Sequence, residues 1–134
     1  MEREYLLRVE RPHALPAGSR QRRVRIGRSS AYRDVEYVQH DTIVELDGRL
    51  GHEAATDRWS DLERDIESAV AGSLTVRLGW GQVLAPCRVA AAVHRVLVTR
   101  GWTGRPSGCS PTCPVSRIDG AEHAPGARQT PQIP

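Results

Sequence analysis

The sequence contains no lysine, and all nineteen of its basic residues are arginine. No mechanism in this chain can therefore use a lysine side chain as base, nucleophile or charge partner. Codon bias in a GC-rich genome explains such an absence, but arginine forks also suit phosphate groups better than lysine point charges do. The net charge of +3 and the pI of about 9.1 permit a polyanionic partner without requiring one.

Apolar residues are also scarce, since the hydrophobic fraction is 39% and the mean hydropathy is −0.47. No apolar run approaches the roughly 18 to 20 residues that a membrane helix needs. The charged start at Glu2, Arg3 and Glu4 does not resemble a signal peptide. Three cysteines are too few and too irregularly spaced for a disulfide framework. A chain of 134 residues with these properties indicates one cytoplasmic domain with a modest core and no membrane association.

The composition changes after Trp102. Residues 103–134 contain most of the prolines, many glycines and serines, and almost no large apolar residues. Such a segment buries too little surface to order itself, so we expect a disordered tail after a folded domain at residues 1–102. Cys109 and Cys113, with His123, offer three zinc ligands of the four that a structural site needs. We therefore expect no Zn²⁺ at Cys109 and Cys113.

Periodicity and turn residues predict alternating helices and strands. The longest predicted helix, over residues 54–71, has an apolar stripe at Ala55, Trp59, Leu62, Ile66 and Ala69. The predicted order is helix 2–11, strands 21–26, 32–38 and 42–47, helix 54–71, strand 74–78 and helix 86–100. This order indicates an α/β domain.

Two acidic residues share one face of the predicted strand 42–47. Side chains alternate along a strand, so Glu45 and Asp47 point the same way. A turn centred on Gln39 and His40 places Asp34 opposite Glu45, whereas a shift of the turn by one residue places Asp34 opposite Asp47. Either register brings Asp34 to the acidic face, and it sends Val35, Tyr37, Val44 and Leu46 to the other face.

Carboxylates gathered on one face repel each other unless a cation compensates their charge. Magnesium prefers oxygen ligands and keeps waters that a substrate phosphate can replace. His52, which follows two glycines, would lie close enough to act as a general base or acid. The alternative is a solvated hairpin face with salt bridges to Arg33 and Arg49. Against it stands Glu45, whose carboxylate in a central strand is costly to bury.

A run of arginines lies on or near the strand predicted at 21–26. One interpretation is a solvated edge strand that charge protects from aggregation. The other is a contact with a phosphate backbone, which would give salt-sensitive, sequence-independent binding. The run comprises Arg20, Arg22, Arg23, Arg25 and Arg28.

Several of these residues stand in a pattern that resembles a known family. Val44-Glu45-Leu46-Asp47-Gly48 with His52 matches its central signature, and Asp34 matches its upstream aspartate. Further matches are Glu2 in the first helix, the Asp61, Arg64 and Asp65 pattern in the long helix, and Arg77 with Trp80 after the next strand. With these motifs, residues 1–102 resemble actinobacterial proteins of unknown function that are similar to very-short-patch-repair endonuclease. That domain belongs to the restriction-endonuclease-like superfamily and also occurs in type IV toxin–antitoxin (abortive infection) proteins.

The resemblance implies a restriction-endonuclease-like fold, with a mixed central sheet flanked by helices, and magnesium-dependent cleavage of DNA, in which Mn²⁺ can replace Mg²⁺. It implies that Asp34, Glu45, Asp47 and Glu2 hold the metal and that His52 assists proton transfer. Asp61, Arg64, Asp65 and Arg77 would support the acids or bind phosphate.

The chain departs from the family pattern at two places. Asp47 replaces the superfamily's usual lysine, as in the repair-endonuclease branch, and the winged-helix region that often precedes the domain is missing, as in a stand-alone or truncated form. The alternative function is a catalytically silent DNA-binding module, or a toxin–antitoxin regulatory module that binds a protein from a neighbouring gene. The sequence does not distinguish DNA from RNA.

Overall fold

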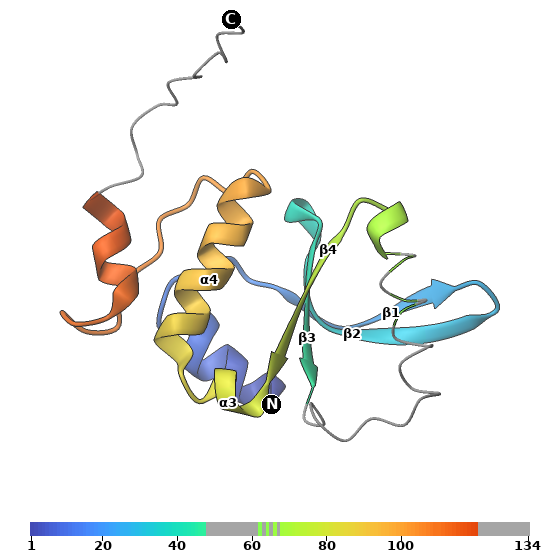
Figure 1. The fold of residues 1–134 in the computed structure, drawn as a ribbon, viewed down its shortest axis with the longest axis horizontal. Helices are drawn as coiled ribbons and strands as arrows, with labels where there is room; N and C mark the ends of the chain where they lie inside the picture. Colours follow the sequence, from blue (N-terminus) through green and yellow to red (C-terminus); the bar gives the residue numbers. More distant parts are fainter. Residues whose placement is uncertain (48–61, 63, 65, 67, 121–134) are drawn as a thin grey trace, which may run out of the picture.

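The structure is a computed structural model of residues 1–134, and it describes residues 1–47, 62, 64, 66 and 68–120 (Figure 1). The described elements, in chain order, are α1 (Glu2–Glu4), the π-helix η1 (Tyr5–Glu10), β1 (Ser19–Ile26), β2 (Ser29–Tyr37), the 3₁₀ turn η2 (Val38–His40), β3 (Thr42–Asp47), β4 (Leu74–Gly79), α3 (Trp80–Val83), α4 (Pro86–Thr99) and the 3₁₀ helix η3 (Pro114–Gly120).

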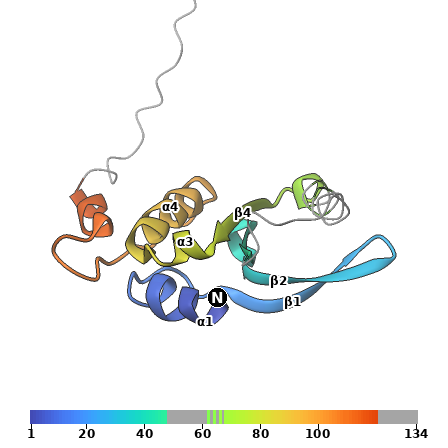
Figure 2. The same cartoon turned by 60° about the horizontal axis from the view of Figure 1, so that its bottom comes forward.

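The four described strands form one mixed sheet in the order β1-β2-β3-β4. Strand β2 is antiparallel to both β1 and β3, and β4 runs parallel to β3. Helices α1, η1 and α4 lie on one side of β3 and β4, and the described helical residues from 62 to 70 lie on the other (Figures 1 and 2). The predicted mixed α/β fold with a sheet flanked by helices is confirmed at this level. No described helix is long and apolar enough to cross a bilayer.

The register of the β2–β3 pair settles which partner faces Asp34. Val35 pairs with Val44, and Tyr37 pairs with Thr42. Continued by one residue, this register sets Asp34 opposite Glu45, as the turn centred on Gln39 and His40 predicts. The connection itself is longer than two residues, because η2 is followed by Asp41 in a left-handed conformation with φ of 45°.

The core lies between the sheet and the helices η1 and α4. Strand residues Val35, Tyr37 and Val44 contribute to it, as the predicted alternation requires, and Leu46 packs against it. The helices contribute Tyr5, Val9, Val89, Ala90, Val93 and Leu97. Because Val35 and Val44 point into this core, Asp34 and Glu45 are left on the opposite face of the sheet.

A buried polar cluster joins η1 to the first two strands. The hydroxyls of Tyr5 and Tyr37 lie 2.9 Å apart, and Tyr37 donates to Glu10 at 3.1 Å. Arg20 forms an ion pair with Glu10 at 2.8 Å, so its charge compensates the buried carboxylate. Burial raises the pKa of both tyrosines and keeps them neutral. Gly18 is required beside them, because a Cβ atom there would lie 2.5 Å from Val35 Cγ1.

The predicted helix 54–71 falls largely outside the described residues. Residues 62, 64, 66 and 68–70 are helical, and Gly72 follows with φ of 81°. The predicted apolar stripe does not face the sheet in this part, since Leu62 and Ile66 are about half exposed. Arg64 and Ser68 are the half-buried positions. The acidic face of the sheet explains why the helix turns Arg64 toward it, because carboxylates attract the arginine rather than the apolar side chains.

The prediction of a disordered tail from residue 103 is wrong for the described part of that segment. Pro106, Cys113 and Val115 are buried, and the last two belong to the core. The backbone N–H of Ser107 donates to the carbonyl of His13 at 2.8 Å. The segment is poor in apolar residues by itself, but the few it has pack against surfaces that the rest of the domain supplies. Residues 121–134 of the predicted tail lie outside the described residues.

Candidate functional site

Asp34 lies where the β2–β3 ladder ends. Beyond the pair of Val35 with Val44, the backbone N–H of Leu46 donates to Asp34 Oδ2 at 2.7 Å instead of to a β2 carbonyl. The carboxylate thus replaces a strand as the partner of β3. This bond holds the Asp34 carboxylate in place beside Glu45.

Glu45 is half-buried, and its pKa is raised from 4.5 to about 7. Burial is the largest cause, and the nearby Asp34 carboxylate raises the pKa further. Three arginines, Arg64, Arg77 and Arg33, act in the opposite direction. The three arginines therefore do not offset the combined effect of burial and the Asp34 charge on Glu45.

Strand β4 supplies one of these arginines and places a glycine, which has no side chain, beside Asp47. Arg77 is the direct neighbour of Glu45 in the parallel β3–β4 register, and Asp47 is the neighbour of Gly79. Asp47 is half-buried and, two residues after Glu45, points from the same face. The structure thus brings Asp34, Glu45 and Asp47 to one face at the carboxyl end of β3, with Arg77 next to them.

Other predicted site residues are less close or lie outside the described part. Glu2 accepts a hydrogen bond from Gln21 and is not among the charged groups that shift the pKa of Glu45. Its role as a metal ligand stays a prediction. Arg64, in the described helical residues, lowers the pKa of Glu45, and its supporting or phosphate-binding role stays a prediction. His52, Asp61 and Asp65 lie outside the described residues.

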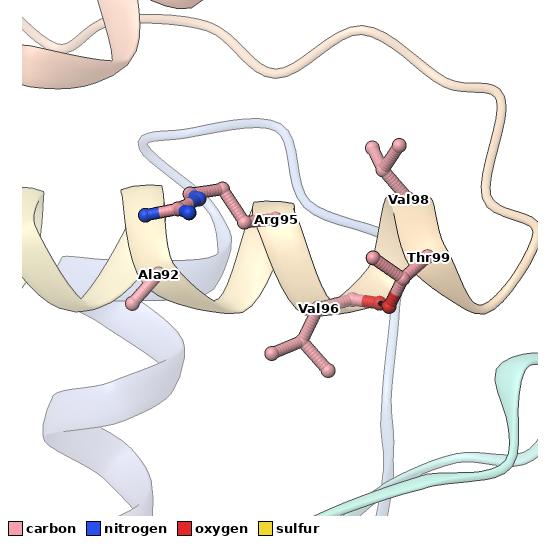
Figure 3. A pocket seen from close by; sticks show the side chains of 5 residues that line it. All are labelled: Ala92, Arg95, Val96, Val98 and Thr99. Carbon is pink, nitrogen blue, oxygen red and sulfur yellow. Dashed lines mark hydrogen bonds between the residues drawn. The ribbon is translucent and has the colours of Figure 1, made fainter. Parts of the chain in front are cut away.

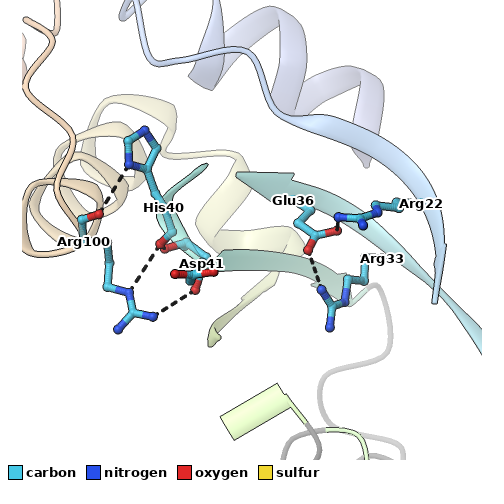
Figure 4. A network of polar contacts seen from close by, with 7 residues as sticks. Arg22, Arg33, Glu36, His40, Asp41 and Arg100 are labelled. Carbon is cyan, nitrogen blue, oxygen red and sulfur yellow. Dashed lines mark hydrogen bonds and ion pairs between the residues drawn. The ribbon is translucent and has the colours of Figure 1, made fainter. Parts of the chain in front are cut away.

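The alternative of an acidic face held by salt bridges finds limited support. Arg33 forms its ion pair with Glu36, which is buried and also binds Arg22 at 3.1 Å (Figure 4). Arg33 therefore acts on both Glu36 and Glu45, and its ion-pair partner is Glu36. Arg49 lies outside the described residues.

The arginine run divides into two groups. Arg20 and Arg22 form ion pairs with Glu10 and Glu36. Arg23, Arg25 and Arg28 are exposed near the tip of the β1–β2 hairpin, which projects away from α1, η1 and α4 (Figures 1 and 2). With Val24 and Ser30 they line an open hollow of about 540 Å³, and none of the three pairs with a described carboxylate.

A second hollow, of about 470 Å³, runs along the C-terminal half of α4 (Figure 3). Its lining residues are Ala92, Arg95, Val96, Val98 and Thr99. Among these described lining residues only Arg95 is ionisable, so they provide no acid–base pair and no metal ligands. At the end of the same helix, Arg100 donates to the carbonyls of His40 and Asp41 and ties α4 to the sheet (Figure 4).

Sequence reasoning missed one cluster. His13, Cys87, Cys109 and Cys113 present nitrogen and sulfur atoms that all lie within 4.8 Å of one another. The spacing of Cys109 and Cys113 was a visible signal, but it suggested His123 as the third ligand. Only the fold brings His13 and Cys87 to the two cysteines, so no local pattern could have revealed the set.

Comparison of the chain with known proteins found no relative. No protein-family model matches the chain, and neither the curated proteins nor the solved structures contain a match.

Proposed function

We propose that this chain is a magnesium-dependent DNA endonuclease with a restriction-endonuclease-like fold. The observation that carries the proposal is the Asp34–Glu45 pair, two carboxylates on one face of the sheet. Burial and the Asp34 charge raise the pKa of Glu45 to about 7 despite three nearby arginines. The four-stranded mixed sheet with helices on both sides is compatible with that fold.

The donor set fits a hard divalent cation. Asp34 and Glu45 supply oxygen ligands, and Asp47 adds a third from the same face. A cation between them would counteract both the burial and the repulsion from Asp34 that raise the pKa of Glu45. Bound there, Mg²⁺ supplies Lewis-acid polarisation of a phosphodiester and lowers the pKa of a water molecule.

The remaining residues have roles that follow from their positions. Asp34 is held by the Leu46 N–H, so it is oriented before any metal or substrate arrives. Arg77 and Arg64 flank Glu45 and provide positive charge for the phosphate that undergoes cleavage. His52 is the residue predicted to transfer a proton, since the chain has no lysine for that role.

The β1–β2 hairpin provides a DNA contact outside the acidic face. Arg23, Arg25 and Arg28 gather around one open hollow and carry guanidinium forks that match phosphate oxygens. Such contacts position a duplex without reading its sequence. The hairpin therefore accounts for binding, and the Asp34–Glu45 pair accounts for cleavage.

Plasmid nicking by the purified full chain tests the proposal. We expect Mg²⁺-dependent nicking by the wild type and its loss in Asp34→Asn and Glu45→Gln, which keep side-chain volume and, in Asp34→Asn, an acceptor for the Leu46 N–H. Asp41→Asn is the matched control, because Asp41 is exposed on the turn before β3 and asparagine tolerates its left-handed backbone. Equal nicking by all four proteins would refute the assignment.

A second candidate is a catalytically silent DNA-binding or toxin–antitoxin regulatory module on the same fold. The observation that favours it is the set of three arginines around Glu45, which reduces the need for a metal. This candidate predicts DNA binding that is independent of Mg²⁺, without nicking. A regulatory module further predicts a stable complex with the product of a neighbouring gene, which co-expression and size-exclusion chromatography would detect.

A further inference from the structure

Four potential metal ligands converge at the end of the molecule that carries the C-terminal segment. His13 follows η1, Cys87 lies in the first turn of α4, and Cys109 and Cys113 precede η3. Their ligand atoms all lie within 4.8 Å of one another. His13 and Cys113 are buried, Cys87 is half-buried and Cys109 is exposed.

The imidazole of His13 is oriented as a ligand. Its Nδ1 lies 2.7 Å from the carbonyl oxygen of Val9, which can only accept, so Nδ1 carries the proton and donates. Nε2 then holds a lone pair, and this buried atom has no hydrogen-bond partner among the described residues. A ligating histidine typically donates its other ring N–H to a backbone carbonyl in this way. The unpartnered nitrogen thus indicates a bound group that contacts both His13 and the cysteines.

The sulfur atoms have the spacing of a shared metal rather than of a disulfide. Cys87 Sγ and Cys109 Sγ lie 3.4 Å apart, well beyond the disulfide bond length of about 2.05 Å. Two sulfurs bound to one Zn²⁺ at about 2.3 Å each in tetrahedral geometry lie about 3.8 Å apart.

The loop that carries two of the cysteines is tightly built. The Ser116 hydroxyl donates to the carbonyl of Ser110 at 2.9 Å and closes the loop. Gly108 leaves the space that the Ser116 side chain fills, and any Cβ at that position would collide with it. This packing fixes Cys109 and Cys113 relative to each other before a metal binds.

We propose that His13, Cys87, Cys109 and Cys113 bind one Zn²⁺ in a closed Cys₃His site. Four protein ligands leave no open coordination position, so the ion is structural rather than catalytic. It fastens the segment from residue 103 to η3 onto α4 and η1, which explains how a segment so poor in apolar residues packs with Val115 in the core. This site is separate from the Asp34–Glu45 pair and does not depend on nuclease activity.

Elemental analysis of the full chain, purified without chelator, tests the site. We expect about one Zn²⁺ per chain and its loss in Cys109→Ser and His13→Gln. Cys109 is exposed, so Cys109→Ser leaves the core intact. His40→Gln is the matched histidine control and retains zinc, because the His40 imidazole contacts the carbonyl of Arg100 and does not belong to the cluster. Asp34→Asn also retains it.

Two measurements on the wild type decide the question even where a variant does not fold. Replacement of the metal by Co²⁺ should give thiolate charge-transfer bands and the strong d–d absorption of a tetrahedral site, both lost when Zn²⁺ is added. Zinc removal should accelerate tryptic cleavage after the exposed Arg117 in η3. A zinc-free protein with three reactive thiols, or with a Cys87–Cys109 disulfide, overturns the proposal, as does zinc retained by Cys109→Ser.

Discussion

Substitution of Glu45 by glutamine should stabilise the metal-free protein at alkaline pH. The pKa of Glu45 lies at about 7 in the folded chain, against an ordinary value of 4.5. Folding thus favours the protonated carboxyl, so the unfolding free energy of the wild type falls as pH rises from about 4.5 to about 7. Glutamine has the same shape but never carries the charge.

The size of the effect follows from the pKa difference. The full difference is equivalent to about 3 kcal/mol, but Glu45 is only half-buried, and solvent screening reduces this to about 1–2 kcal/mol. We therefore expect Glu45→Gln to be more stable than the wild type by about 1–2 kcal/mol at pH 8, with a difference that shrinks toward pH 5. Comparison of the two proteins at each pH cancels the titration of all other groups.

Urea unfolding in metal-depleted buffer at pH 5, 6, 7 and 8 measures the difference. Addition of Mg²⁺ at pH 8 should reverse its sign, because the cation binds only when Glu45 is present and charged. A stability difference that does not change with pH would refute the raised pKa of Glu45, and with it the reason to place a cation there.

Three further outcomes follow from other parts of the structure. Mn²⁺ affinity, measured by electron paramagnetic resonance, should fall about tenfold per pH unit below about 7 as Glu45 takes up a proton, and Glu45→Gln should lose this dependence. Arg25→Ala combined with Arg28→Ala should reduce the slope of log K against log salt for DNA binding by about 2, whereas an unchanged slope would exclude the hairpin as a phosphate contact. Gly18→Ala should lower the unfolding free energy by about 1–3 kcal/mol, because the added Cβ would lie 2.5 Å from Val35 Cγ1; unchanged urea unfolding would contradict that close packing.

Local alternation was sufficient to predict the acidic face. The sequence placed Val35, Tyr37 and Val44 in the core and left Asp34 and Glu45 on the other face, and the register of β2 and β3 confirms this arrangement. Period-two patterns are reliable here because a shift by one residue would expose every apolar side chain of the pair.

Contacts between segments that are distant in the chain could not be predicted from sequence patterns. Nothing near Asp34 indicates that it receives the Leu46 N–H, because that bond exists only where the β2–β3 ladder ends. The apolar pattern around Leu62 and Ile66 predicted a core-facing stripe, but the acidic sheet attracts Arg64 instead. Likewise, composition suggested disorder around Cys113, because it does not reveal burial that other segments provide.

Diffraction from crystals soaked in Mn²⁺ tests the central claim most directly. Manganese scatters anomalously and takes the same oxygen ligands as magnesium. We predict an anomalous peak between the carboxylates of Asp34 and Glu45 that is absent in crystals of Glu45→Gln. A wild-type crystal in which these carboxylates bind only Arg64 and Arg77, with no peak between them, would contradict the account.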